Sequence, residues 1–461
     1  MFKKNIYFLS AIFLVFCSMT SFAQDKSAQT SVSEKLLFKF DLPPAVLVAS
    51  PDGKHVAYAT RAEGKEFVIV DGREQKRYDG IGSNIVFSPD SRHFAYRVQS
   101  GNKQLIVVDG KEGKHYDSVG SNIVFSPDSQ RIAYAARVGK KCFAVIDGQE
   151  GNYYEGGIGS SFVFSPDSKH LAYGVLSEGK QFAVVDGKEG KHYYGIGNNF
   201  VFSPDGNRVA YLAKSDKKTF WVVDGREGKQ YDDVGINFFF SPNSQKFAYI
   251  ARSANKWFAV VNEKEGKYYD GVGDHIFFSP DSSRVAYQVQ SEKKRLLIVD
   301  GQEGKGYERI GSSIVFSPDS KQLAYIAQSA NKKFMVVIDG KEEKQYDNIG
   351  NGSLIFSPDS RHLAYGAQSG KKRFVVVDGK EWKHYDGVGS RTLAFSPDSK
   401  SLAYIAQSEN KQIAVINDKE IDQYDAIVAL SNGAFIFDTF NNLRFLAFKE
   451  KSVYVVETKI R

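Results

Sequence analysis

Histidine is the residue type in this 461-residue chain that could most readily do acid–base chemistry, and its placement is almost entirely periodic. Seven of the eight histidines occupy two recurrent positions: His55, His93, His170 and His362 after a Ser-Pro-Asp segment, and His115, His192 and His384 before a tyrosine. His275, beside Asp274, is the exception. A His–Asp neighbour without a nucleophile is not a triad. We therefore expect His275 to be a polar rim residue, and we expect neither catalysis nor a cofactor.

Metal chemistry is equally poorly supported by the residue pattern. The chain holds two cysteines, too few for a cysteine-built zinc cluster or a disulfide scaffold. The acidic residue of each Ser-Pro-Asp segment stands alone in its repeat, whereas calcium requires clustered oxygen ligands. We expect the aspartates to form turns, in which Pro presets φ and Asp bonds nearby backbone amides. No metal site is predicted.

The elements that carry these residues are set by an internal repeat of 38 to 40 residues. In the unit that begins at Ser83, apolar runs at 84–87, 94–98, 104–108 and 115–117 are separated by turn residues, a pattern typical of short β-strands. Four such strands cannot bury both faces of their sheet, so each unit must pack against its neighbours, as the blades of a β-propeller do. The repeat is marked by Pro51, Pro89, Pro127, Pro166, Pro204, Pro242, Pro280, Pro318, Pro358 and Pro397, and a degraded eleventh copy follows.

The repeated segment resembles the WD40-like propeller repeat of the TolB type, often called PD40. The resemblance rests on FSPDSRHFAY (87–96), FSPDSKHLAY (164–173), FSPDGNRVAY (202–211) and FSPDSRHLAY (356–365), and it covers nearly all of residues 46–410. It implies a propeller fold and, because that family mostly presents binding surfaces, a binding function. The chain departs from the family in its shorter, more uniform units and in lacking a separate N-terminal domain of the TolB kind.

We predict an all-β propeller of about eleven four-stranded blades over residues 36–461. The last unit supplies three strands and no fourth, and residues 36–40 form an unpaired strand before the first unit, so we expect the two ends to pair in one closing blade. One large ring would have a wide central opening. Two consecutive rings of five and six blades remain the alternative.

The N-terminus predicts export. Lys3 and Lys4 precede the apolar stretch 5–16, which is short for a bilayer span, and small residues stand before a cleavage point after Ala23. We interpret residues 1–23 as a signal peptide, with an uncleaved anchor as the alternative, and residues 24–35 as a flexible mature N-terminus. Cleavage would leave Cys142 as the single cysteine and 59 basic residues against 54 acidic ones, a net charge of +5. No later segment is long and apolar enough to cross a membrane, so we expect a periplasmic or cell-surface protein.

One face of the predicted propeller repeats two chemistries. Polar residues follow a Gly-Ile/Val-Gly segment between blades and should ring the channel mouth: Asn84, Asn122, Asn199, Asn237, His275 and Arg391. Lysine pairs occupy the hairpins between second and third strands: Lys140 and Lys141, Lys217 and Lys218, Lys293 and Lys294, Lys332 and Lys333, Lys371 and Lys372. A basic funnel would suit an acidic protein or an anionic cell-envelope polymer. The plainer interpretation is that lysine keeps hairpin edges soluble and that Gly with Ser or Asn is turn chemistry.

Our leading hypothesis is a non-catalytic scaffold for protein–protein interaction. The alternative is a carbohydrate-binding or carbohydrate-active protein that uses the channel mouth. We expect no nucleic-acid partner, because an export signal separates the protein from nucleic acid and the net charge is modest.

Overall fold

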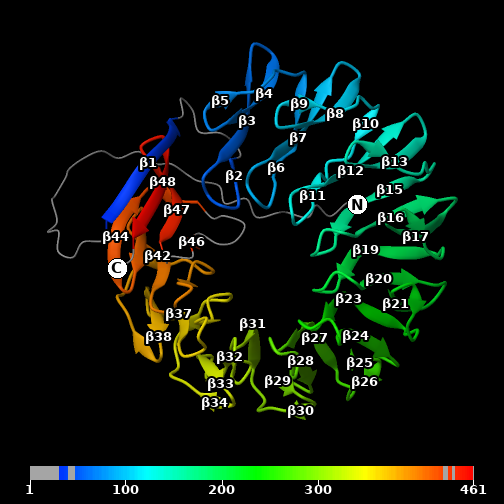
Figure 1. Ribbon diagram of the computed structural model, residues 1–461. Coiled ribbons are helices and arrows are strands. Elements are labelled where there is room, and N and C mark those ends of the chain that lie inside the picture. The colour runs from blue at the N-terminus through cyan, green and yellow to red at the C-terminus, as the bar shows by residue number, and fades with distance from the viewer. Residues whose placement is uncertain (1–30, 40–46, 429–434, 439–441, 460–461) are drawn as a thin grey trace.

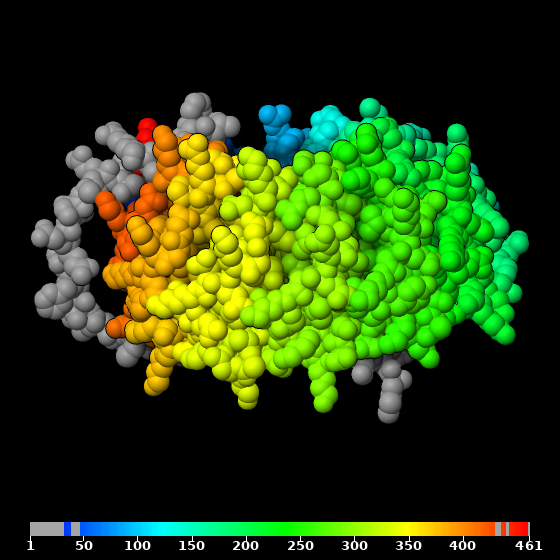
Figure 2. All heavy atoms as spheres, turned by 90° about the horizontal axis from the view of Figure 1, so that it is seen from below, coloured from blue at the N-terminus to red at the C-terminus, as the bar shows by residue number. Residues whose placement is uncertain are grey.

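The computed structural model describes residues 31–39, 47–428, 435–438 and 442–459, and these residues form strands and turns without a helix. Eleven antiparallel sheets stand side by side in one ring (Figure 1). Seen from its edge, the ring is a flattened disc (Figure 2). The fold is a β-propeller, and the single ring confirms the first of the two predicted arrangements. We number the blades 1 to 11 from the sheet that begins with β2. The predicted signal peptide lies outside the described residues.

The innermost strands differ in length. Blades 1, 2 and 4 to 8 have an uninterrupted innermost strand: β2 (Val48–Ala49), β6 (Gly80–Phe87), β15 (Gly157–Phe164), β19 (Gly195–Phe202), β23 (Asp233–Phe240), β27 (Gly271–Phe278) and β31 (Arg309–Phe316). In blades 3, 9, 10 and 11 it is broken in two: β10 (Ser118–Val119) and β11 (Val124–Phe125), β35 (Asn348–Ile349) and β36 (Ile355–Phe356), β40 (Gly387–Val388) and β41 (Ala394–Phe395), β45 (Ala426–Ile427) and β46 (Ile436–Phe437).

The second and third strands form the regular centre of each blade. The second strands are β3 (Val56–Ala62), β7 (Phe94–Ser100), β12 (Ile132–Val138), β16 (Leu171–Ser177), β20 (Val209–Lys214), β24 (Phe247–Ser253), β28 (Val285–Ser291), β32 (Leu323–Gln328), β37 (Leu363–Ser369), β42 (Leu402–Ser408) and β47 (Leu443–Lys449). The third strands are β4 (Lys65–Val70), β8 (Lys103–Val108), β13 (Lys141–Ile146), β17 (Lys180–Val185), β21 (Thr219–Val223), β25 (Lys256–Val261), β29 (Lys294–Val299), β33 (Phe334–Ile338), β38 (Lys372–Val377), β43 (Lys411–Ile416) and β48 (Ser452–Lys459).

The fourth strands begin earlier than predicted. They are β5 (Arg73–Glu74), β9 (Lys111–Glu112), β14 (Gln149–Glu150), β18 (Lys188–Glu189), β22 (Arg226–Glu227), β26 (Lys264–Glu265), β30 (Gln302–Glu303), β34 (Lys341–Glu342), β39 (Lys380–Glu381) and β44 (Lys419–Tyr424). Of the predicted strand 115–117, Tyr116 alone forms a ladder bridge, with Gln104. The chain bulges between Glu112 and Tyr116, because the Gly113 amide turns back to the carbonyl of Ile106.

The core lies between blades rather than within them. In the cluster between blades 2 and 3, Ala95 and Ile106 from one sheet pack against Tyr134 and Phe143 from the next. A middle strand therefore has both faces covered, and Leu105, Ile106 and Val107 are all buried. This explains why the third strands are continuous apolar runs rather than alternating ones.

The ring closes as predicted. β1 (Ser31–Lys39) pairs antiparallel with β48 as the outermost strand of blade 11. Figure 1 shows β1 and β48 side by side. β1 begins at Ser31, so residues 31–35, which we expected to be flexible, belong to the closing strand. The Tyr424 hydroxyl of blade 10 donates to the Glu34 carboxylate at 2.9 Å, a contact that reaches from blade 10 to the first strand of the chain.

We predict that the closing strand is needed for a stable ring. A chain that starts at residue 40 lacks β1, so β48 becomes a bare edge, and its melting temperature should fall while larger species elute in size-exclusion chromatography. A chain that starts at residue 31 keeps β1 and is the matched control. Equal melting temperatures for the two truncations would contradict the role assigned to β1.

Candidate functional site

The two faces of the ring carry different turns. We call the face with the Ser-Pro-Asp turns and the turns between third and fourth strands the turn face. We call the face with the hairpins between second and third strands the hairpin face. The polar residues that recur in the sequence can be followed on each face in turn.

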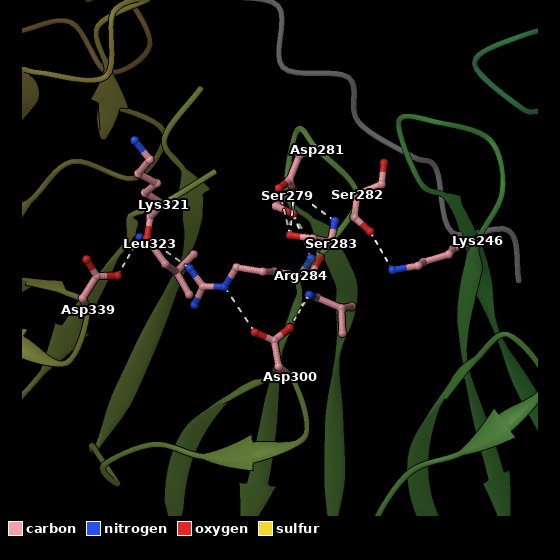
Figure 3. Close-up of polar contacts among 11 residues, drawn as sticks. Lys246, Ser279, Asp281, Ser282, Ser283, Arg284, Asp300, Lys321, Leu323 and Asp339 are labelled. Carbon is pink, nitrogen blue, oxygen red and sulfur yellow. Dashed lines mark hydrogen bonds and ion pairs between the residues drawn. The ribbon is translucent and has the colours of Figure 1, made fainter. Parts of the chain in front are cut away.

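The Ser-Pro-Asp segment is a closed turn (Figure 3). In blade 7 the Ser279 hydroxyl donates to the Asp281 carboxylate at 2.6 Å and accepts from the Arg284 amide at 2.9 Å. The same carboxylate accepts from the Ser283 amide at 2.9 Å. The turn interpretation of the motif is confirmed, and each aspartate is used within its own turn.

The same turn also joins neighbouring blades. Ser282 closes the turn with its amide bonded to the Ser279 carbonyl, and it adopts a left-handed φ of 64°. Its hydroxyl accepts from the Asn243 amide of blade 6 at 3.0 Å. One blade later, Ser320 accepts from the Asp281 amide at 2.9 Å. Glycine would relieve the backbone strain but offers no hydroxyl, so serine is favoured where the preceding blade needs an acceptor.

The histidines that follow the turn have a structural role. The Nδ1 atoms of His55, His93, His170 and His362 lie 2.6–2.7 Å from an Asp carboxylate in the turn between third and fourth strands of the same blade. Arg131, Arg208 and Arg284 contact the equivalent carboxylates at 2.9–3.2 Å. Two of the other histidines stack on a buried phenylalanine: His192 on Phe182 and His384 on Phe374, with ring centroids 4.1 and 4.2 Å apart.

A belt of glutamates joins the blades at their outer edge. In blade 7, Glu303 accepts from Lys267 at 2.6 Å and from the Tyr269 hydroxyl at 3.0 Å, both in blade 6. The same pairing recurs where Lys229 and Tyr231 of blade 5 meet Glu265 of blade 6. Burial and the nearby glutamate raise the pKa of Tyr269 well above its ordinary value, so the phenol stays a donor. This belt was not predicted, although the spacing from Tyr to the next Glu repeats visibly.

On the hairpin face the lysine pairs divide into two kinds. The second lysine of a pair lies at the start of the third strand and forms an ion pair with an acid in the segment that enters the next blade: Lys218 with Asp232, Lys294 with Glu308, Lys333 with Asp347 and Lys372 with Asp386. Lys141 instead lies over the Tyr153 ring at 5.4 Å. The acid also contacts the next blade, since Asp232 accepts from the Ala254 amide of blade 6 at 2.9 Å. Five of the ten lysines proposed for a basic face are therefore engaged by neighbouring side chains of the protein.

The first lysine of each pair is different. Lys140, Lys217, Lys293, Lys332 and Lys371 are exposed, and within the described ranges none of them has an ion-pair partner. We call these five residues the tip lysines. Exposed acids on the hairpin tips, Glu178, Asp216, Glu292 and Glu409, also have no ion-pair partner in the described ranges.

Of the residues predicted to ring the channel mouth, Asn84, Asn199, Asn237 and His275 lie in the innermost strands, whereas Asn122 and Arg391 lie between the two halves of a broken one. Asn84, Asn199 and Asn237 each donate their side-chain amide to a backbone carbonyl of the next blade: Ser121, Ile236 and Asp274, at 3.3, 3.5 and 3.0 Å. Asn122 lies between β10 and β11. These amides are thus partly occupied by contacts between blades.

Two predicted mouth residues sit at irregular points. His275 bonds to Asp274 at 2.9 Å, with its side chain 55% exposed, and its ring lies 5.8 Å from Phe239. Asn237 donates to the carbonyl of Asp274, so the two predicted residues lie close together. Arg391 has a φ of 75°, and its side chain lies beside Gly352 of the preceding blade. His275 is placed as a polar rim residue.

Exposed tyrosines were missed by the sequence reasoning. Tyr153, Tyr194 and Tyr268 are 54%, 63% and 48% exposed. Lys180 lies over the Tyr194 ring at 3.7 Å, where most blades have a Lys–Asp pair. The signal was present, because Tyr194 stands in the repeat where most blades have Asp or Glu.

The described residues contain no group of three His, Cys, Asp or Glu side chains arranged to hold a metal ion. No helix in the described part of the chain could span a membrane. Cys142 is a half-buried free thiol on β13.

Comparison with known proteins adds little about the role of this surface. No protein-family model matches the chain, and no curated protein matches it. Among solved structures, it is similar to a crystal structure of a eukaryotic initiation factor, with 15% identity over 67% of this chain and 89% of that chain and a TM-score of 0.39. It is also similar to the dihydro-heme d1 dehydrogenase NirN in complex with DHE, with 14% identity over 68% and 77% and a TM-score of 0.31.

We predict that the turn serines stabilise the ring through their hydroxyls. Ser320→Ala leaves the Asp281 amide unpaired and keeps the left-handed backbone, so it should destabilise the protein by about 1–2 kcal/mol. Ser320→Gly loses the same bond but relieves about 1 kcal/mol of strain, so it should fall between Ala and wild type. Thermal unfolding of the three proteins gives the order. An alanine variant more stable than the glycine variant would contradict this assignment.

The turn aspartates predict sensitivity to acid. The hydroxyl of Ser203 and the groups of Asn207 lower the pKa of Asp205 to about 2, and Ser165 lowers that of Asp167 to about 2. Because the pKa in the folded state lies below the unfolded value of about 4, the stabilisation is complete above pH 4 and is lost as the pH falls to 2.

The check is the melting temperature between pH 2 and 7 at constant ionic strength. The double variant Asp167→Asn with Asp205→Asn should decline less steeply below pH 4, and Asn243 shows that the turn accepts asparagine. A decline as steep as that of the wild type would refute the contribution of these two carboxylates.

Proposed function

We propose that this chain is an exported, non-catalytic β-propeller that acts as a protein-interaction scaffold in the periplasm or at the cell surface. We propose further that it binds an acidic partner protein through its hairpin face. The observation that carries the proposal is how the repeat uses its polar groups. The turn serines and aspartates, the fourth-strand glutamates and their tyrosine partners bond within a blade or to a neighbouring one, whereas the tip lysines are exposed and unpaired in the part of the chain that the structure describes.

The electrostatics of the hairpin face support this choice of partner. Lys218, Lys294, Lys333 and Lys372 are paired with acids and contribute little net charge to the face. The tip lysines of blades 3, 8 and 9 have no acid on their own hairpin, whereas Asp216 and Glu292 offset Lys217 and Lys293 in blades 5 and 7. The positive field of the face is therefore strongest at blades 3, 8 and 9. A surface of this kind raises the association rate of an acidic protein and selects against basic ones.

The leader-like N-terminus and the TolB-type resemblance of the repeats support the proposed place and role. The segments FSPDSRHFAY and FSPDSKHLAY are those of a family that mostly presents binding surfaces. A signal peptide over residues 1–23 would deliver the propeller to the cell envelope.

A second candidate function is binding of an anionic carbohydrate or cell-envelope polymer. The specific observation in its favour is Tyr194, which is 63% exposed and has Lys180 over its ring. An exposed aromatic ring beside a cation can stack on a sugar and pair with its carboxylate. This candidate predicts binding concentrated at blades 4 and 5 rather than around the whole face.

We predict that reversing the charge of the five tip lysines abolishes partner binding. In cells that carry a photo-crosslinking residue at Asp216, next to Lys217, the wild-type protein should crosslink to a discrete set of acidic proteins. Replacing the tip lysines with Glu should lower that yield by about tenfold or more, because the encounter then becomes repulsive.

The matched control replaces five exposed lysines of the fourth strands, Lys111, Lys188, Lys264, Lys341 and Lys380, with Glu. It makes the same change in net charge away from the hairpin face and should leave the crosslinks intact. Equal loss in both variants would mean that overall charge, not the hairpin face, matters. Unchanged crosslinks in the tip variant would rule out this binding surface.

A further inference from the structure

The turn face of the ring has a cavity between blades 8 and 9 that the repeat does not fill. It has a volume of about 190 Å³ and is lined by Gln322 and Glu343 of blade 8 and by Phe356, Arg361, His362 and Tyr365 of blade 9, among others. For scale, a water molecule takes about 30 Å³ of liquid volume. The cavity lies on the face opposite the tip lysines.

At three other blade junctions an arginine of the chain itself occupies the corresponding place. Arg284 of blade 7 contacts the Asp300 carboxylate through Nε at 3.2 Å and donates through Nη1 to the Lys321 carbonyl of blade 8 at 3.2 Å (Figure 3). Its guanidinium lies 5.3 Å from the ring centroid of Phe316, also in blade 8. The guanidinium thus has a carboxylate, an aromatic face and a carbonyl as its three partners.

The other two junctions repeat parts of this arrangement. Arg131 contacts Asp147 at 3.1 Å and lies 5.2 Å from the Phe164 ring of the next blade. Arg208 contacts Asp224 at 2.9 Å and lies 5.3 Å from the ring of Phe240. The contact geometry is therefore a recurring guanidinium site of this fold rather than a single case.

Blade 8 keeps the partners of the guanidinium and lacks the guanidinium. Its residue at the arginine position is Gln322. Two of the guanidinium's partners are present in blade 9, where Phe356 supplies the aromatic ring and Arg361 supplies the backbone carbonyl. The carboxylate is Asp339, which follows the lining residue Ile338. Asp339 accepts from the Leu323 amide at 3.0 Å through Oδ1, and Oδ2 has no ion-pair partner within the described blades (Figure 3).

Comparison along the chain shows that this mismatch is particular to blade 8. Where the turn carries Asp, the facing residue is His or Arg in the other described blades. Where the facing residue is Lys246 or Ser401, the turn carries the neutral Asn262 or Asn417 instead. Gln322 opposite Asp339 leaves a negative charge without compensation.

A second residue that differs from the repeat, Glu343, lines the same cavity. Glu343 stands where blades 2 to 7 have glycine, for example Gly304 in blade 7. It is exposed, lines the cavity and adds a second carboxylate that has no cationic partner in the described part of the chain. His362 on the far wall is already bonded to Asp378 at 2.7 Å, and Arg361 is the one cation among the lining residues.

We propose that this cavity binds a guanidinium group, presented by the arginine side chain of a partner polypeptide. The planar fork would take the place that Arg284 takes one junction earlier, pairing with Asp339, stacking on Phe356 and donating to the Arg361 carbonyl. Glu343 would add attraction at the entrance. This site is independent of the hairpin face and of the function proposed for it.

The test uses isothermal titration calorimetry of the full mature chain with three probes: the peptide Ac-Gly-Ser-Arg-Ser-Gly-NH2, its lysine counterpart, and agmatine. We expect saturable binding of the arginine peptide at one site below about 10 mM and weaker binding of the lysine peptide. Agmatine binding as tightly as the arginine peptide would point to a small guanidinium compound as the source. No saturable binding of either guanidinium probe would overturn the proposal.

Three variants locate the site. Gln322→Arg supplies the chain's own guanidinium, as blades 3, 5 and 7 do, and should weaken peptide binding by about tenfold or more. Gln245→Arg adds the same charge to an exposed turn of blade 6 and should leave binding unchanged. Arg284→Gln empties the equivalent place between blades 7 and 8 and should create a second site. Unaltered binding in Gln322→Arg, or a stoichiometry still at one in Arg284→Gln, would contradict the assignment.

Because the tip lysines are untouched in these proteins, the crosslinking pattern of the hairpin face should persist in Gln322→Arg. A loss of both peptide binding and crosslinks together would show that the two faces are not independent. Either proposal can therefore fail without the other.

Discussion

The contact between neighbouring blades is the interaction on which the structure depends. A four-stranded sheet of this size cannot cover its own faces, so its apolar side chains are buried only when the next blade is present. The clusters around Tyr134 and Phe143 draw residues from two sheets, and the third strands are apolar on both faces for that reason. Polar bonds then fix the distance and angle between blades on both faces and at the outer edge.

This dependence explains why so many recurrent polar residues have a structural role. A turn serine with a strained backbone is favoured because its hydroxyl reaches the preceding blade, as that of Ser320 does. The glutamate of a fourth strand is retained because Lys and Tyr of the preceding blade point at it, as at Glu303. The closure of the ring uses the same kind of contact between blades, since the Glu34 carboxylate of β1 accepts a hydrogen bond from the Tyr424 hydroxyl. Function is then expected where a residue is exposed and unpaired, or where a blade departs from the rule.

Much of the fold was predictable, because a repeat shows its turns and apolar runs many times over. The sheet order, the number of blades and the pairing of β1 with β48 followed from strand count and from the missing fourth strand of the last unit. The position of the fourth strand was missed, because Lys111 and Glu112 look like a polar loop and only the Tyr116 bridge lies in the predicted run.

The site was less predictable. Whether Lys218 is free or paired with Asp232 depends on a cross-strand distance that sequence spacing does not reveal. The same holds for the cavity between blades 8 and 9. Gln322 and Glu343 are visible in the sequence as departures from the repeat, but only the structure shows that both line one space beside Phe356.

Hydrogen–deuterium exchange of the full chain carrying Glu303→Gln tests most directly whether stability is shared across the blade junctions. Glu303 belongs to blade 7, and its partners Lys267 and Tyr269 belong to blade 6. The account predicts that amide protection falls in both blades, including strands β24 and β25, and stays unchanged in blades 1 and 2. A loss confined to blade 7, with blade 6 as protected as in the wild type, would contradict it.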